Sequence, residues 1–124
     1  MNPAPSLTDE RWVFCTVARM PAHLPVAPLM TFREAEGLTL VLPKAAAESL
    51  GLQSSATFRQ ITLTVQSSLE AVGLTAAVSS ALARAGIACN IVAAYHHDHL
   101  FVPEASAHKA LEVLQSISAG IDLK

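Results

Sequence analysis

The sequence predicts an α+β fold in which antiparallel strands form sheets that carry helices on one face. Three observations lead to this expectation. Residues 58–66 alternate between apolar and polar side chains, which is typical of a strand with one buried face. Residues 74–82 place leucine, valine and leucine four positions apart, which predicts an amphipathic helix. A strand that ends in proline at a helix start occurs twice, at Pro43 and at Pro103.

The first half of the chain is expected to hold three strands and one helix. Residues 11–18 are rich in β-branched and aromatic side chains and predict a strand. Three closely spaced prolines follow, which forbid a helix and leave an extended connection. Residues 29–33 and 38–42 then predict a hairpin, because Gly37 supplies the backbone freedom that a tight turn often needs. Proline opens a helix over residues 43–50.

The second half is expected to follow the order strand, helix, strand, strand, helix. The alternating strand at 58–66 leads through a connector into a helix at 73–85. Residues 87–94 and 99–102 predict two further strands, and residues 104–117 predict a last helix.

Both halves match the ferredoxin-like pattern of strands and helices. The first has its first helix replaced by the proline-rich connection, and the second has its last strand missing or supplied from elsewhere. We therefore predict two ferredoxin-like halves, residues 1–57 and residues 58–124.

Composition and charge narrow the class of protein. Hydrophobic residues make up 52% of the 124 residues and charged residues only 15%, which excludes intrinsic disorder and suggests a subunit interface, hence a homodimer. The net charge is −2 and the basic residues are scattered, so neither nucleic acid nor a membrane is an expected partner. Cys15 and Cys89 lie in apolar runs and no leader pattern is seen, which predicts reduced thiols in a cytoplasmic protein.

Three segments, residues 31–43, 61–75 and 88–103, carry a resemblance to a known family. They resemble the small bacterial ACT-domain proteins related to the eukaryotic cytosolic arginine sensor, over roughly residues 10–117. The resemblance implies tandem ferredoxin-like modules that bind an amino acid or similar small molecule between two modules and regulate a partner protein. No phosphate loop, nucleophile motif or dinucleotide fingerprint is present, so we expect neither an enzyme nor a cofactor.

The connector that leads into the helix at residue 73 is the candidate ligand site. A helix N-terminus offers unpaired N–H groups and a partial positive charge, which suit a carboxylate. An ordinary helix cap is the competing interpretation. The amide of Asn90 is expected to be buried within an apolar strand, and the hairpin tip at 95–99 forms a possible further wall. The candidate ligand-binding residues are Ser67, Ser68, Leu69, Val72, Gly73, Leu74, Asn90, Tyr95 and His97.

The run His96-His97-Asp98-His99 has side chains of the kind that bind zinc. Strand parity argues against a metal site, because His97 and His99 share one face and the two other residues share the opposite face. A polar hairpin tip and a contact surface for a second module are the alternatives. Three functions therefore compete: a non-catalytic amino acid sensor, a protein-interaction or dimerisation module without ligand, and a metal-binding protein.

Overall fold

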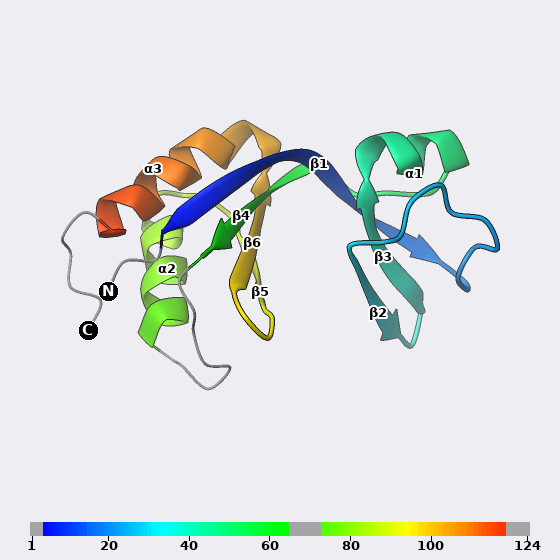
Figure 1. Cartoon of the computed structure of the whole chain (residues 1–124), viewed down its shortest axis with the longest axis horizontal. Helices are drawn as coiled ribbons and strands as arrows, with labels where there is room; N and C mark the ends of the chain where they lie inside the picture. Colours follow the sequence, from blue (N-terminus) through cyan, green and yellow to red (C-terminus); the bar gives the residue numbers. More distant parts are fainter. Residues whose placement is uncertain (1–3, 65–72, 119–124) are drawn as a thin grey trace. The chain divides into compact units, whose positions relative to one another are not determined.

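The computed structural model describes residues 4–64 and 73–118 and shows an α+β fold with an antiparallel sheet (Figure 1). The chain forms two compact units. Glu10–Phe58 form one, here called the α1 unit, and the described parts of Met1–Asp9 and Arg59–Lys124 form the other, the α2/α3 unit. The predicted fold class is confirmed. The sequence placed a division between residues 57 and 58, whereas the α2/α3 unit also includes the start of the chain.

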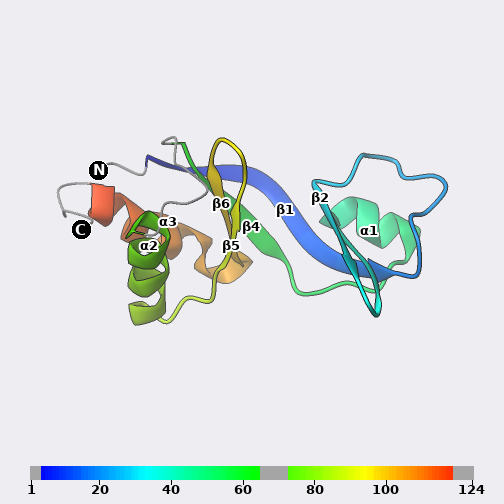
Figure 2. The same cartoon turned by 90° about the horizontal axis from the view of Figure 1, so that it is seen from below.

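The α1 unit contains the strand order β2-β3-β1. Of strand β1 (Pro5–Val17), residues 10–17 belong to this unit. Strands β2 (Met30–Glu34) and β3 (Gly37–Pro43) form the predicted hairpin. The predicted 43–50 helix is α1 (Lys44–Leu50), which begins after Pro43. The proline-bearing segment between β1 and β2 contains no helix (Figure 2). Buried Val13, Cys15, Leu40, Leu42 and Ala47 form the core of this unit.

The segment after α1 closes the sheet of the α1 unit at the free side of β1. Ser54 forms an antiparallel bridge with Cys15. The Ser55 N–H donates to the Phe14 carbonyl at 2.9 Å, and the Phe14 N–H donates to the Ser55 hydroxyl, also at 2.9 Å. A short stretch of chain around Ser54 therefore occupies the place of the fourth strand in a ferredoxin-like sheet, next to β1.

The α2/α3 unit has the strand order β1-β4-β6-β5. Its elements are β4 (Phe58–Leu63), α2 (Gly73–Arg84), β5 (Asn90–Ala93), β6 (Asp98–Pro103), a 3₁₀ turn (Glu104–Ser106) and α3 (Ala107–Ser118). Strand β5 is shorter than the predicted 87–94, because the chain at residues 87–89 runs outside the sheet. Among the described residues, no helix has the length and apolar character needed to cross a bilayer.

The strand missing from the second half is supplied by the chain's own N-terminus. The predicted strand at 11–18 begins earlier, at Pro5, and its first residues pair with β4. The Thr64 N–H donates to the Ala4 carbonyl at 3.2 Å. The Arg59 guanidinium donates to the Thr8 carbonyl from Nε at 3.2 Å and from Nη2 at 2.9 Å. One strand therefore serves the sheets of both units.

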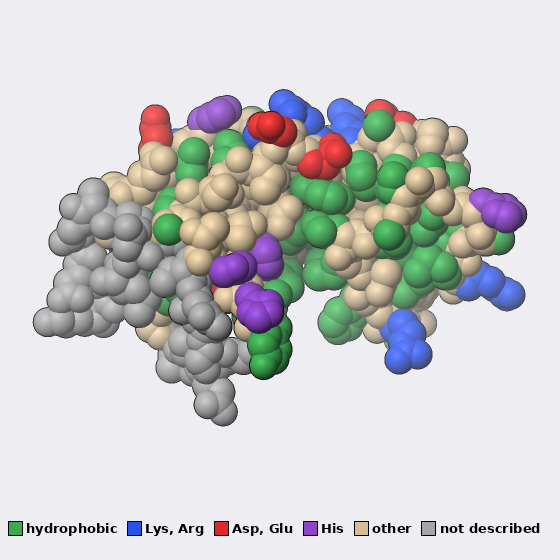
Figure 3. Space-filling view, in the orientation of Figure 1, with side chains coloured by type: hydrophobic (Ala, Val, Ile, Leu, Met, Phe, Trp, Pro, Cys, Tyr) green, Lys and Arg blue, Asp and Glu red, His purple; other side chains and the backbone are tan. Residues whose placement is uncertain are grey.

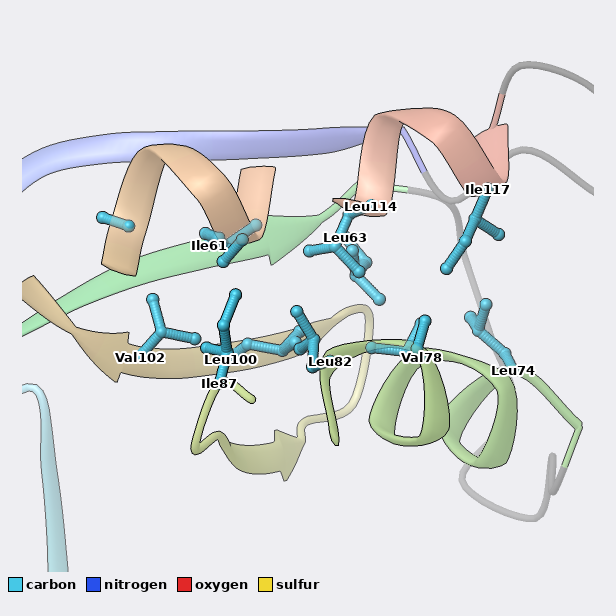
Figure 4. Close-up of a cluster of buried hydrophobic side chains, with 13 residues drawn as sticks. Ile61, Leu63, Leu74, Val78, Leu82, Ile87, Leu100, Val102, Leu114 and Ile117 are labelled. Carbon is cyan, nitrogen blue, oxygen red and sulfur yellow. The ribbon is translucent and has the colours of Figure 1, made fainter. Parts of the chain in front are cut away.

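The helices of the α2/α3 unit cover one face of its sheet and enclose the larger core (Figure 4). Alternation along β4 and β6 directs Ile61, Leu63, Leu100 and Val102 toward the helices. The predicted stripe of α2 is confirmed, since each of its three residues is buried. The fully or nearly fully buried core residues include Leu74, Val78, Leu82, Ile87, Ala107, Ala110, Leu114 and Ile117.

Candidate functional site

The predicted ligand loop connects β4 to α2. Ser67, Ser68, Leu69 and Val72 lie outside the residues that the structure describes. Gly73 is the first residue of α2 and is exposed, and no other described residue comes within 4 Å of the position that a Cβ would take. Leu74 is only 4% exposed and its side chain belongs to the core (Figure 4), so it packs between the helices and the sheet.

The hairpin that joins β5 to β6 carries the aromatic and imidazole side chains. The Ala94 N–H donates to the His97 carbonyl at 3.0 Å, which leaves Tyr95 and His96 as the two residues of the tip. Tyr95 is 79% exposed and its ring lies edge-on to His96, with the centroids 4.9 Å apart. Asn90 is exposed at the start of β5, so the expectation of a buried amide is wrong. The reason is that β5 is the edge strand of this sheet.

A polar cluster lies where β4 and β6 are neighbours. It is on the face of the sheet opposite the one that packs against the helices. His99 Nδ1 is 3.1 Å from Gln60 Nε2 and 3.1 Å from Thr62 Oγ1. Gln60 is buried, and Thr62 and His99 are half-buried. Nδ1 accepts a hydrogen bond from Gln60 in the tautomer that carries the imidazole proton on Nε2.

The surroundings of His99 lower its pKa below the ordinary value of 6.5. Burial is the largest cause, because it penalises the charged ring, and repulsion from His97 adds to it. The Asp98 carboxylate acts in the opposite direction. His97 has a buried Nδ1 without a hydrogen-bond partner in the described part of the chain. The imidazole rings of His97 and His99 lie near each other, with their centroids 6.5 Å apart.

His99 should make the folded protein less stable in mild acid. The unfolded chain takes up a proton at the ordinary pKa of 6.5 while the folded chain resists it, so the free energy of unfolding falls as the pH drops from 6.5 toward the lowered pKa. Urea denaturation at about pH 7.5 and about pH 5 measures this loss. His99→Gln should lose less stability between the two pH values than the wild type. His108→Gln, which changes an exposed histidine of α3, should behave like the wild type. Equal losses in His99→Gln and the wild type would contradict the assignment.

The metal hypothesis gains no geometric support. Within residues 4–64 and 73–118, no group of three or more His, Cys, Asp or Glu side chains is arranged to hold a metal ion. The parity argument explains this, because Asp98 is buried toward the core side while His99 faces the Gln60 side. Both cysteines are free thiols, and burial raises the pKa of Cys15 and of Cys89, so neither is an activated nucleophile.

Sequence reasoning missed the polar cluster around His99, although part of its signal was present. Thr62 has a polar position in the alternation of residues 58–66, and Gln60 has the same parity. Their meeting with His99 depends on β4 and β6 being neighbours, which the alternation within one strand does not reveal.

Comparison with protein families decides what kind of chain this is. Two models, each described as an ACT domain, match residues 2–59 and residues 55–116. This chain belongs to the ACT-domain family. The resemblance inferred from the sequence is confirmed at this level, and the tandem arrangement of two ACT-domain matches agrees with two ferredoxin-like halves. Comparison with functionally curated proteins gave no match.

Solved structures share the fold of this ACT-domain chain. A Vibrio cholerae protein of unknown function, described as a possible transport protein, is 52% identical over 91% of this chain and 87% of its own, with a TM-score of 0.84. An Agrobacterium tumefaciens protein is 15% identical over 92% of this chain and 87% of its own, with a TM-score of 0.76. The regulatory subunit of aspartate kinase from Thermus flavus is 10% identical over 91% of this chain and 95% of its own, with a TM-score of 0.64.

Proposed function

We propose that this ACT-domain chain is a non-catalytic, cytoplasmic regulatory protein that binds a small molecule, an amino acid, and acts on a partner protein. The observation that carries the proposal is the pair of ACT-domain matches, which together extend from residue 2 to residue 116. A fold shared with the regulatory subunit of an aspartate kinase supports a regulatory role. The finer relation to the arginine sensor stays a prediction, as does the division into domains at residues 1–57 and 58–124.

The proposed ligand site is the segment Ser67–Leu74, between β4 and α2. The end of β4 lies beside the start of β6, because Thr62 contacts His99. The end of β4 and the tip of the β5–β6 hairpin therefore lie at the same end of the sheet. At the start of α2, free backbone N–H groups and the helix dipole favour a ligand carboxylate. Within the described part of the chain nothing occupies the Cβ position of Gly73, which favours the approach of a ligand to the backbone. Asn90, Tyr95 and His97 are the proposed further contacts.

Gly73→Val should weaken amino acid binding at least about tenfold, because a branched side chain would occupy the space through which the ligand reaches the helix N-terminus. The fold should persist, since Gly73 does not have a positive φ and its Cβ position is free. A thermal-shift screen of the common amino acids identifies the ligand, which at about 100 times its Kd should stabilise the protein by about 2.7 kcal/mol. Calorimetric titration then compares the variant with the wild type.

Ala83→Val is the matched control, because it adds the same side chain at an exposed position near the other end of α2. It should bind with wild-type affinity. Equal affinities for Gly73→Val and Ala83→Val would place the ligand elsewhere, and a wild type that binds no amino acid would remove the sensor proposal.

A pure interaction module is the second candidate, and the exposed apolar side chains of the α1 unit favour it. Met20, Val26, Leu29 and Phe32 are 46%, 42%, 43% and 67% exposed. Large apolar groups in contact with water favour association. Both candidates include a homodimer, which light scattering would detect as twice the 13.1 kDa chain mass. A dimer that binds no amino acid would support this second candidate over the first.

A further inference from the structure

A groove opens at one end of the α1 unit, between the segment after β1 and the β2–β3 hairpin. It has a volume of about 530 Å³. The register that pairs Val17 with Leu38 brings the end of β1 beside the start of β3, so the residues just beyond both strands face a common space. The lining residues are Ala18, Arg19, Met20, Arg33, Glu34, Ala35, Glu36, Gly37 and Leu38.

Two guanidinium groups give this groove its chemistry. Arg19 and Arg33 are exposed, and neither guanidinium has a hydrogen-bond or ion-pair partner among the residues that the structure describes. Figure 3 shows basic side chains at the end of the α1 unit where β1 stops and β2 turns into β3. The carboxylates of Glu34 and Glu36 line the same groove, and Glu34 accepts a hydrogen bond from the Thr39 hydroxyl at 2.5 Å. Guanidinium groups bind carboxylates strongly because two parallel N–H donors match two oxygens.

Apolar side chains complete the groove beside the arginines. Met20 is 46% exposed, and Ala18 and Leu38 line the same space. Methionine adapts to ligands of irregular shape because its side chain is unbranched and polarizable. A ligand that suits both parts of the groove has a carboxylate at one end and a short apolar tail at the other.

We propose that this groove is a second small-molecule site, which binds a small carboxylate with an apolar tail. Arg19 and Arg33 hold the carboxylate, and Met20 and Leu38 contact the tail. The position agrees with the internal repeat, because in the α2/α3 unit the proposed Ser67–Leu74 site also follows the first strand of the ferredoxin-like pattern, at the end where the hairpin turns. The residues of the groove carry this proposal by themselves, so it stands whether or not Gly73 limits binding in the other unit.

The test uses three probes of one shape on the isotope-labelled full chain: L-leucine, 4-methylpentanoate, which lacks the ammonium group, and L-leucinamide, which lacks the carboxylate. Amide NMR shifts locate each probe. We expect the two carboxylates to move the amides of residues 18–20 and 33–38, and leucinamide to leave them in place. Arg19→Gln combined with Arg33→Gln should weaken 4-methylpentanoate at least tenfold, about 1.4 kcal/mol.

Arg84→Gln is the matched control, because it removes one exposed charge at the end of α2, outside the α1 unit. It should leave the shifts at 18–20 and 33–38 unchanged. The proposal is overturned if no probe moves these amides at millimolar concentration, if leucinamide binds as well as the acids, or if the double arginine variant binds like the control. Shifts confined to residues near Gly73 would support the first site and reject the second.

Discussion

Leu82→Ala should destabilise the protein by about 3 to 4 kcal/mol, close to the middle of the range for buried leucines. Leu82 is completely buried on α2, in the core between the two helices and the sheet (Figure 4). Truncation removes three carbon atoms from contact with Val78, Leu100 and their neighbours, and leaves a cavity that rigid strands on one side cannot close. Urea denaturation followed by far-UV circular dichroism measures the loss, since α2 and α3 supply most of the helical signal.

Ser80→Ala is the matched control on the same helix, because Ser80 is exposed. Its free energy of unfolding should stay within about 0.5 kcal/mol of the wild type. The emission of Trp12, on the part of β1 that belongs to the α1 unit, follows the other unit in the same titration. A change in Leu82→Ala below about 1 kcal/mol would contradict the core assignment, because truncation of a buried leucine typically costs about 2 to 5 kcal/mol.

The elements of the fold could be predicted from local patterns, while the pairing of distant segments could not. The spacing of Leu74, Val78 and Leu82 reports the buried face of α2, and the structure confirms it. In the predicted strand 58–66, Ile61 and Leu63 lie in the core as expected, but β4 ends at Leu63 and residues 65 and 66 lie outside the described residues. The first part of β1 escaped prediction because Pro5–Glu10 mixes proline, serine and acidic residues, with Leu7 as its single large apolar side chain. Its strand conformation depends on β4, more than 50 residues away in the chain.

The candidate site could likewise be predicted only where it depends on local sequence, not where it depends on the pairing of distant strands. The exposed Gly73 at the start of α2 follows from sequence, because glycine and a helical stripe mark the position. The polar surroundings of His99 depend on Gln60 and Thr62, which a different sheet order would have placed elsewhere. The interpretation of Asn90 as a buried amide was wrong because an apolar strand can also be an edge strand, where polar side chains reach water.

Arg59→Met should cost about 2 to 3 kcal/mol and should loosen the start of β1 in particular. Arg59 is only 7% exposed, and both of its hydrogen bonds end on the carbonyl of Thr8. Methionine keeps the apolar stem but provides no donor, so a carbonyl that was satisfied by a charged group loses its partner. Hydrogen bonds to charged groups contribute about 1.5 to 3 kcal/mol, and Thr8, whose carbonyl loses the donor, is half-buried.

The position of the loss distinguishes this interpretation from a general loss of packing. The Thr64 N–H donates to the Ala4 carbonyl, so its hydrogen exchange reports whether the start of β1 stays on β4. In Arg59→Met this amide should exchange faster than the wild type by a larger factor than the amides of β3, which pair with the other part of β1. Arg59→Lys keeps one charged donor, so its Thr64 amide should exchange at a rate between those of the wild type and Arg59→Met. If all amides accelerate equally in Arg59→Met, the guanidinium does not specifically hold the N-terminal strand, because its removal would then act only on global unfolding.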